Sequence, residues 1–202
     1  MIAKLIGVVD YGIGNHGSVC SAFSKLGCDC QISSDLDVLN RCDALVLPGV
    51  GSFGAAIAAI EYRNMSAWLA EKAGHGTPIL GICLGMQLLL EKSYEDGVHK
   101  GLGIIPGEVV PFDIRTTHIG WNDVYSVSQI DTQHNLVGAC YFNHSYCCDV
   151  PDTVRTMSTD YRGEFTAAFQ KGNIFGYQFH PEKSQLTGKI LLRHFLEESL
   201  SA

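Results

Sequence analysis

The sequence has no long hydrophobic run and no run of positive charge. Its N-terminal segment MIAKLIGVVDYG is apolar for only a few residues before Asp10, too short for a membrane-spanning helix or a signal peptide. Lysine and arginine number 14 against 21 aspartate and glutamate residues, and the net charge of −7 disfavours binding to nucleic acid or to an anionic membrane. We therefore expect a cytoplasmic protein with no nucleic acid or membrane partner.

Internal repeats, low-complexity segments and Pro/Ser-rich linkers are also missing. Charged residues make up 17% of the chain and hydrophobic residues 46%, a balance typical of a compact, ordered interior. A length of 202 residues suits one well-buried core. The sequence thus predicts a single domain over residues 1–202.

Cysteine, in contrast, is abundant, with eight residues. Because no export signal accompanies them, we expect reduced thiols rather than disulfides. Cys140, His144, Cys147 and Cys148 lie close together in the sequence, but no second CxxC or HxxxH pair completes a set of four zinc ligands. We expect no metal site and no cofactor.

The first half of the chain alternates short apolar runs with helical patterns, which indicates parallel βα units. Strands are predicted at Leu5–Asp10, Cys28–Ile32, Ala44–Leu47 and Pro78–Ile82, and helices at Ala55–Ile60, Met65–Ala73 and Leu84–Lys92. A further helix follows the first strand, because Val19, Ala22, Phe23 and Leu26 recur at helical spacing.

The second half changes to strand-like runs separated by short polar turns, and it ends in an amphipathic helix at Leu186–Leu200. The strand-like runs are Val109–Phe112, Asn122–Val127, Val137–Tyr146, Val154–Ser158, Phe165–Gln170 and Ile174–Phe179. The predicted fold class is α/β: a single domain with a central, mostly parallel sheet flanked by helices and an antiparallel extension.

The segment Gly81-Ile82-Cys83-Leu84-Gly85 lies between a predicted strand and a predicted helix. This arrangement is typical of a nucleophile elbow, in which a tight turn exposes the nucleophile and small residues prevent clashes. The dipole of the following helix would favour a thiolate at Cys83. The alternative interpretation is one more inert buried thiol.

Phe179-His180-Pro181-Glu182 follows the last predicted strand. A cysteine nucleophile acting on an amide needs a base to move protons and an acceptor to orient that base. His180 and Glu182 supply these two groups, although a His-x-Glu pair is also compatible with a surface ion pair.

The segment Pro48-Gly49-Val50-Gly51 follows another strand and is rich in glycine. Its glycines would let a peptide N–H turn toward a developing oxyanion, with the Leu84 N–H as a second donor. The alternative is an ordinary strand-to-helix turn.

Five segments together resemble the class I, or triad, glutamine amidotransferases: PGVG (48–51), GICLGMQ (81–87), HIGWN (118–122), YFNHSY (141–146) and QFHPEKS (178–184). Within that class, the chain is most similar to the glutaminase subunits of imidazole glycerol phosphate synthase. The similarity covers nearly the whole chain.

The resemblance implies a catalytic triad of Cys83, His180 and Glu182, which releases ammonia from glutamine. It also implies an oxyanion hole of Val50, Gly51 and Leu84. The glutamine head would be held by Gln87, Glu95, Ser145 and Tyr146. The implied partner is a (βα)₈-barrel cyclase that receives the ammonia, and the residues implied at the interface or gate are Asn15, Trp121, Asn122 and Lys183. The alternative for the aromatic residues Tyr11 and Trp121 is a place in the core.

Two departures from the family pattern concern the partner rather than the glutaminase chemistry. His16-Gly17 stands where relatives usually have Leu-Arg, and Thr117 replaces a proline before His118. A paralogous glutaminase of a surface-sugar amidating system is therefore the alternative, and the glutaminase of pyridoxal 5′-phosphate synthase is a weaker one. A regulatory subunit without activity and a cysteine protease of similar elbow geometry are the competing functional classes.

Overall fold

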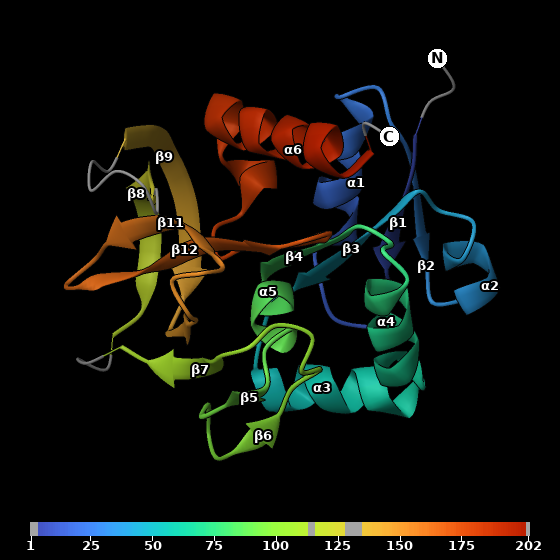
Figure 1. The fold of residues 1–202 in the computed structure, drawn as a ribbon, viewed down its shortest axis with the longest axis horizontal. Helices are drawn as coiled ribbons and strands as arrows, with labels where there is room; N and C mark the ends of the chain where they lie inside the picture. The colour runs from blue at the N-terminus through green and yellow to red at the C-terminus, as the bar shows by residue number, and fades with distance from the viewer. Residues whose placement is uncertain (1–3, 113–115, 128–134, 201–202) are drawn as a thin grey trace.

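The computed structural model describes residues 4–112, 116–127 and 135–200 of the chain. Its centre is a mixed β-sheet with helices on both faces (Figure 1). Five strands form the parallel part, in the order β2 (Asp29–Ser33), β1 (Leu5–Val9), β3 (Ala44–Gly49), β4 (Ile79–Cys83) and β13 (Ile174–Tyr177). The predicted α/β class is confirmed.

The antiparallel part begins where β13 pairs with β12 (Glu164–Lys171). The sheet then continues through β10 (Tyr146–Asp149), β7 (Glu108–Pro111), β5 (Lys92–Ser93) and β6 (His99–Lys100). A branch leaves this path at β12 through β11 (Arg155–Asp160), β8 (His118–Ser126) and β9 (Asn135–His144). Apart from β6 and from β5, which pairs with β7 in parallel, these strands correspond to the predicted antiparallel extension; the single strand predicted at Val137–Tyr146 is divided between β9 and β10.

The helices divide between the two faces of the parallel strands (Figure 1). One face is covered by α1 (His16–Ser24) and α6 (Gln185–Leu200), and the other by α3 (Phe53–Tyr62), α4 (Met65–Gly74) and the short α5 (Leu84–Leu88). The one-turn helix α2 (Leu36–Leu39) follows β2, and the 3₁₀ helix η1 (Pro181–Lys183) precedes α6. In the described part of the chain, no helix is long and apolar enough to cross a membrane.

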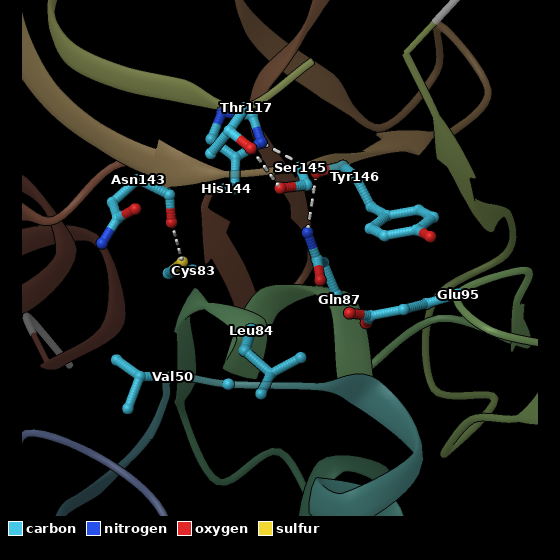
Figure 2. Close-up of a pocket in the computed structure, with 11 residues that line it drawn as sticks. Val50, Cys83, Leu84, Gln87, Glu95, Thr117, Asn143, His144, Ser145 and Tyr146 are labelled. Atoms are coloured by element: carbon cyan, nitrogen blue, oxygen red, sulfur yellow. Dashed lines mark hydrogen bonds between the residues drawn. The ribbon is translucent and has the colours of Figure 1, made fainter. Parts of the chain in front are cut away.

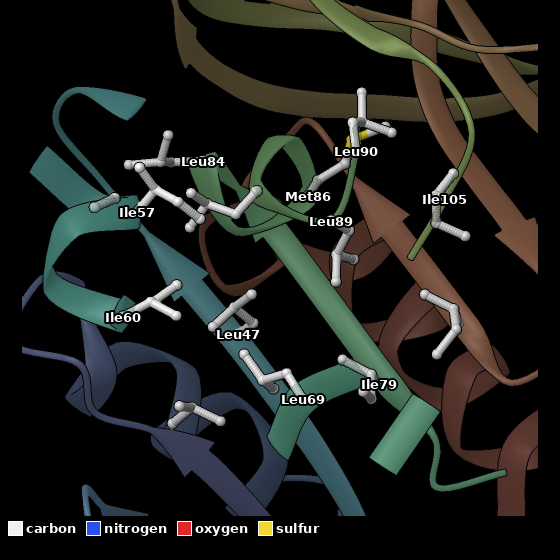
Figure 3. Packing of buried hydrophobic residues seen from close by; sticks show 14 of the residues in the cluster. Leu47, Ile57, Ile60, Leu69, Ile79, Leu84, Met86, Leu89, Leu90 and Ile105 are labelled. Carbon is white, nitrogen blue, oxygen red and sulfur yellow. The ribbon is translucent and has the colours of Figure 1, made fainter. Parts of the chain in front are cut away.

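The alternation of strand residues produces two hydrophobic cores, one on each face of the sheet. In β3, Leu45 and Leu47 pack toward α3, α4 and α5, whereas Ala44 and Val46 pack toward α1 and α6. Figure 3 shows the first of these cores, in which Leu47 lies among the helix side chains. A strand buried on both faces is continuously apolar, as expected for the parallel part of a sheet.

The helix predicted at Leu84–Lys92 ends earlier than expected, at Leu88. The carbonyls of Leu88 and Leu90 accept hydrogen bonds from the N–H groups of Leu102 and Gly103 rather than from a next helical turn. The chain then enters the β5–β6 hairpin, which the sequence did not predict. The run of buried leucines has a helical sequence pattern, but its tertiary hydrogen bonds end the helix at Leu88.

The expectation that all eight cysteines are reduced is wrong for one pair. Cys20 of α1 and Cys30 of β2 are joined by a disulfide, with Cα atoms 5.5 Å apart. The physical reason is the turn between α1 and β2, which packs the helix against the strand and brings residues ten positions apart side by side. The free cysteines are Cys28, Cys42, Cys83, Cys140, Cys147 and Cys148.

Candidate active site

The predicted catalytic residues follow the carboxyl ends of neighbouring parallel strands. Gly49 at the end of β3 lies in register with Cys83 at the end of β4, and β13 on the other side of β4 leads toward His180. Ligand sites in open α/β sheets form at this edge. Segments far apart in the sequence therefore meet at one place because of the strand order.

Cys83 has the strained backbone of a nucleophile elbow, with φ 54° and ψ −112°. The flanking glycines are required by space, because a Cβ on Gly85 would overlap the carbonyl of Leu47, and one on Gly81 would lie 2.7 Å from the Met86 backbone. The turn from β4 into α5 can therefore be this tight only with glycine on both sides of the cysteine. The elbow prediction is supported by this geometry.

His180 and Glu182 form a buried pair behind Cys83. The Nδ1 atom of His180 lies 2.9 Å from Oε1 of Glu182, and the two side chains are only 3% and 1% exposed. This burial excludes the surface ion pair considered above. The second oxygen of Glu182, Oε2, is buried without a hydrogen-bond partner among the described residues, so His180 is the group that stabilises the carboxylate charge.

The electrostatics of the pair favour a protonated imidazole. Burial lowers the pKa of His180, but the interactions with Cys83 and Glu182 outweigh it and raise that pKa from 6.5 to about 9. The Glu182 carboxylate and the Cys83 sulfur, both of which interact with the ring, explain the direction, since each favours its cationic form. An imidazolium beside the sulfur can stabilise a thiolate and donate a proton to a leaving amine.

Cys83 is 5% exposed, and its sulfur has two polar neighbours besides the imidazole. Its thiol donates to the Asn143 carbonyl over 3.7 Å, and the Gln178 amide nitrogen lies 3.9 Å from the sulfur. Such long contacts to sulfur are weak, so the thiol is held in position but can leave these partners when it attacks a substrate.

A cavity of about 210 Å³ opens at Cys83 (Figure 2). It is lined by Val50, Gly51, Cys83, Leu84, Gln87, Glu95, Thr117, Asn143, His144, Ser145 and Tyr146. All residues predicted for the oxyanion hole and for the glutamine head are among them. The cavity therefore has the nucleophile at one end and the polar side chains predicted to hold the substrate along its walls.

Two of the lining residues present polar groups suited to an amino-acid head. Gln87 is buried, and its amide nitrogen donates to the Tyr146 carbonyl over 2.9 Å. Glu95 accepts a 2.8 Å hydrogen bond from the Phe53 N–H, and burial raises the pKa of its carboxyl group. A carboxylate in this partly buried position is a suitable partner for a substrate ammonium.

The glycine-rich loop is held at one end and open at the other. The Tyr11 hydroxyl donates a 2.7 Å hydrogen bond to the Pro48 carbonyl, and a Cβ on Gly49 would lie 2.7 Å from that hydroxyl oxygen. Gly51 has φ 95°, a conformation that favours glycine, and nothing lies within 4 Å of its Cβ position. Val50 is 40% exposed at the mouth of the cavity.

The residues predicted for the partner face come together only in part. Trp121 is half exposed, and its ring lies 6.1 Å from that of Tyr141, which also has the Lys183 ammonium 5.5 Å above it. Trp121 is therefore not a core aromatic, whereas Tyr11 is completely buried. Asn122 instead donates to the Asp160 carbonyl between β8 and β11, and Asn15 lies at the start of α1.

Sequence reasoning missed several residues of the site. Gln178 contacts both Gln87 and Cys83, Asn143 and His144 line the cavity, and Thr117 hydrogen bonds to Ser145 over 3.0 Å. Gln178 and His180 are two positions apart, so a polar residue on the same side of an extended chain was the available signal. Within the described ranges, Cys140, His144, Cys147 and Cys148 do not form a group of three or more potential metal ligands.

Comparison with known proteins identifies the family. Residues 7–198 match the model of the family "Glutamine amidotransferase class-I". Among curated relatives, "Imidazole glycerol phosphate synthase subunit HisH" of Lactococcus lactis is 44% identical, covering 96% of this chain and 99% of that protein. The protein of the same name from Methanothermobacter thermautotrophicus is 45% identical, covering 96% and 98%.

Solved structures agree on the fold. The structure of PurLQS from Thermotoga maritima matches 97% of this chain and 99% of that chain with a TM-score of 0.76, at 20% identity. A glutamine amidotransferase from Thermotoga maritima matches 98% of this chain and 84% of that chain with a TM-score of 0.65, at 19% identity. With a family match over nearly its whole length and relatives above 40% identity, the chain belongs to the class I glutamine amidotransferases.

Proposed function

We propose that this chain, as one domain over residues 1–202, is the glutaminase subunit of an imidazole glycerol phosphate synthase and that Cys83 is its nucleophile. The observation that carries the proposal is the position of Cys83, on a strained elbow at the head of a cavity, with the buried His180–Glu182 pair behind it. The names of the relatives support the histidine route over the surface-sugar alternative and over pyridoxal 5′-phosphate synthase.

In the first half-reaction, the Cys83 thiolate attacks the side-chain carboxamide carbon of glutamine. The negative charge that develops on the carboxamide oxygen is accepted by backbone N–H groups of Leu84 and of the Val50–Gly51 loop. His180 donates its proton to the amide nitrogen, the C–N bond breaks, and ammonia leaves. A γ-glutamyl thioester then remains on Cys83.

In the second half-reaction, the now neutral His180 takes a proton from water, and the resulting hydroxide attacks the thioester carbon. The C–S bond breaks, glutamate leaves, and the thiolate–imidazolium pair is restored. Glu182 holds the ring and stabilises its charge in both steps. Glutamine is positioned by Glu95 at its ammonium and by the Ser145–Tyr146 backbone at its carboxylate, with Gln87 bracing that wall.

The proposed partner is a (βα)₈-barrel cyclase subunit that takes up the ammonia. The half-exposed Trp121 lies beside Tyr141, whose ring also has the Lys183 ammonium above it, and this supports an interface on this side of the molecule. The backbone N–H of His180 donates to the Tyr141 carbonyl over 2.8 Å, so His180 lies next to this surface. Ammonia released beside His180 is therefore close to this surface. Asn15, at the start of α1, and Asn122 are proposed to belong to the same interface.

The test is co-purification of this chain with a histidine-pathway cyclase and with a barrel from a sugar-amidating system, followed by glutamine-dependent synthesis. We expect a stable complex and glutamine-dependent product with the cyclase alone. A complex with the sugar-pathway barrel only would overturn the assignment of the partner, whereas glutamate release in that complex would leave the glutaminase chemistry intact.

A further inference from the structure

A chain of buried hydrogen bonds connects β8 to the wall of the glutamine cavity. It starts at His118, which is 2% exposed and lies in register with His144 across the β8–β9 pair. The Nδ1 atom of His118 is 3.2 Å from Nε2 of His144, and Nδ1 of His144 is 2.8 Å from the Tyr146 carbonyl oxygen. His118 thus stands behind His144, which lines the cavity.

The direction of each hydrogen bond in this chain is determined by the atoms. A carbonyl oxygen only accepts, so Nδ1 of His144 carries a hydrogen and donates it to Tyr146. Burial lowers the pKa of His144 to about 3 and that of His118 to about 4, so both rings are neutral at neutral pH. Nε2 of His144 is then an acceptor, and Nδ1 of His118 must be its donor.

The same carbonyl is held from the other side by Gln87, whose amide nitrogen donates to it over 2.9 Å. That nitrogen also lies 3.1 Å from the Gln178 side-chain oxygen, and the Gln178 nitrogen faces Cys83. The Tyr146 carbonyl is therefore the point where the histidine pair from β8 and the glutamine pair behind the nucleophile meet. In Figure 2, His144 and Gln87 approach the Tyr146 backbone from different directions.

We propose that His118 is a positioning residue for glutamine binding: its Nδ1–H fixes His144 and thereby the Tyr146 segment that meets the substrate's head. This inference rests on the proposed function, in which the Ser145–Tyr146 backbone meets the carboxylate of glutamine and Gln87 braces that wall. Without the donor, Nε2 of His144 becomes a buried acceptor with no partner, and its ring can relieve this only by giving up the hydrogen bond to Tyr146.

The surroundings of His118 allow donor and ring to be tested separately. Its imidazole is stacked between the rings of Phe142 and Tyr161, at centroid distances of 4.6 and 4.1 Å. His118→Phe keeps an aromatic ring in this stack and removes the donor. His118→Asn removes the ring and keeps an N–H at about the position of Nδ1, so it is the matched control.

Both variants are assayed for glutaminase activity in the complex with the cyclase. We expect His118→Phe to raise KM for glutamine about tenfold, the effect of one unpaired buried acceptor, with kcat changed by less than about threefold. His118→Asn should keep KM within about threefold of the wild type. A normal KM in His118→Phe would overturn the proposal. So would a KM raised in His118→Asn as much as in His118→Phe or more, because the imidazole would then contribute by packing and not by its hydrogen bond to His144.

Alkylation of Cys83 provides a second readout that does not depend on turnover. Iodoacetamide does not use the substrate's head, so it should inactivate His118→Phe at the wild-type rate, whereas an electrophilic glutamine analogue should react about tenfold more slowly. Equal slowing with both reagents would indicate a displaced nucleophile and would contradict the positioning role. If neither reagent inactivates the wild type, the proposed function fails instead.

Discussion

Replacing Glu182 by glutamine tests whether the carboxylate keeps the His180 imidazole protonated. A pKa raised from 6.5 to about 9 corresponds to about 3 kcal/mol in favour of the charged imidazole. Cys83 and Glu182 supply this preference against the cost of burial, and Glu182→Gln removes the carboxylate charge without changing the shape of the side chain. The effect of one neighbouring opposite charge on a pKa is about 1–3 units, so the proton of His180 should be lost at correspondingly lower pH.

The assay is the pH profile of kcat/KM for glutamine hydrolysis in the complex with the cyclase. Since the first step needs the imidazolium as acid, the wild-type rate should fall as pH rises through about 9. In Glu182→Gln, the same fall should begin at lower pH, and the rate at neutral pH should drop by about 10²-fold or more, the usual contribution of an oriented acid–base group.

His180→Ala is the matched comparison, because it removes the ring itself. It should be more damaged than Glu182→Gln, since the ring transfers the protons whereas the carboxylate orients the ring and supports its charge. An unchanged alkaline limb in Glu182→Gln would refute the claim that Glu182 keeps His180 charged. Small and equal losses in both variants would refute the triad.

Three further predictions concern the elbow and the glycine-rich loop. Gly85→Ala should lower the free energy of unfolding by about 1–3 kcal/mol or more, because the added methyl group meets the Leu47 carbonyl. Urea denaturation measures this loss, and a variant as stable as the wild type would contradict the close approach. Tyr11→Phe should cost about 1–3 kcal/mol in the same measurement by leaving the buried Pro48 carbonyl without its donor, and no loss would mean that water replaces it. The isolated chain should release glutamate about 10²–10³-fold more slowly than the complex with ligand-occupied cyclase, because the N–H of the Val50–Gly51 peptide turns toward the oxyanion only on docking. Full glutaminase activity in the isolated chain would reject this gating.

The sequence was sufficient for the parallel βα half of the fold and for part of the cavity, since every residue predicted for the oxyanion hole and the glutamine head lines it. Periodicity located β3 and β4 because strands buried on both faces are continuously apolar, and glycine spacing marked the elbow because only glycine fits beside Leu47. The strand order then explains why Cys83 and His180 meet, although they are far apart in the sequence.

What the sequence could not provide are features set by tertiary contacts. The β5–β6 hairpin depends on hydrogen bonds to Leu88 and Leu90 across the chain, and the Cys20–Cys30 disulfide depends on how α1 lies on β2. The His118–His144 pair has no signature in the spacing of its members, since it results from the register of β8 on β9.

The most direct test of the central claim is the Cys83→Ala variant in complex with the cyclase. Product formation should be lost with glutamine and retained with ammonia, because only the thiolate chemistry is removed. In the wild type, an electrophilic glutamine analogue should label Cys83 and none of the other free cysteines. Glutamine-dependent synthesis by Cys83→Ala, or a label found on Cys147 or Cys148, would contradict the assigned nucleophile.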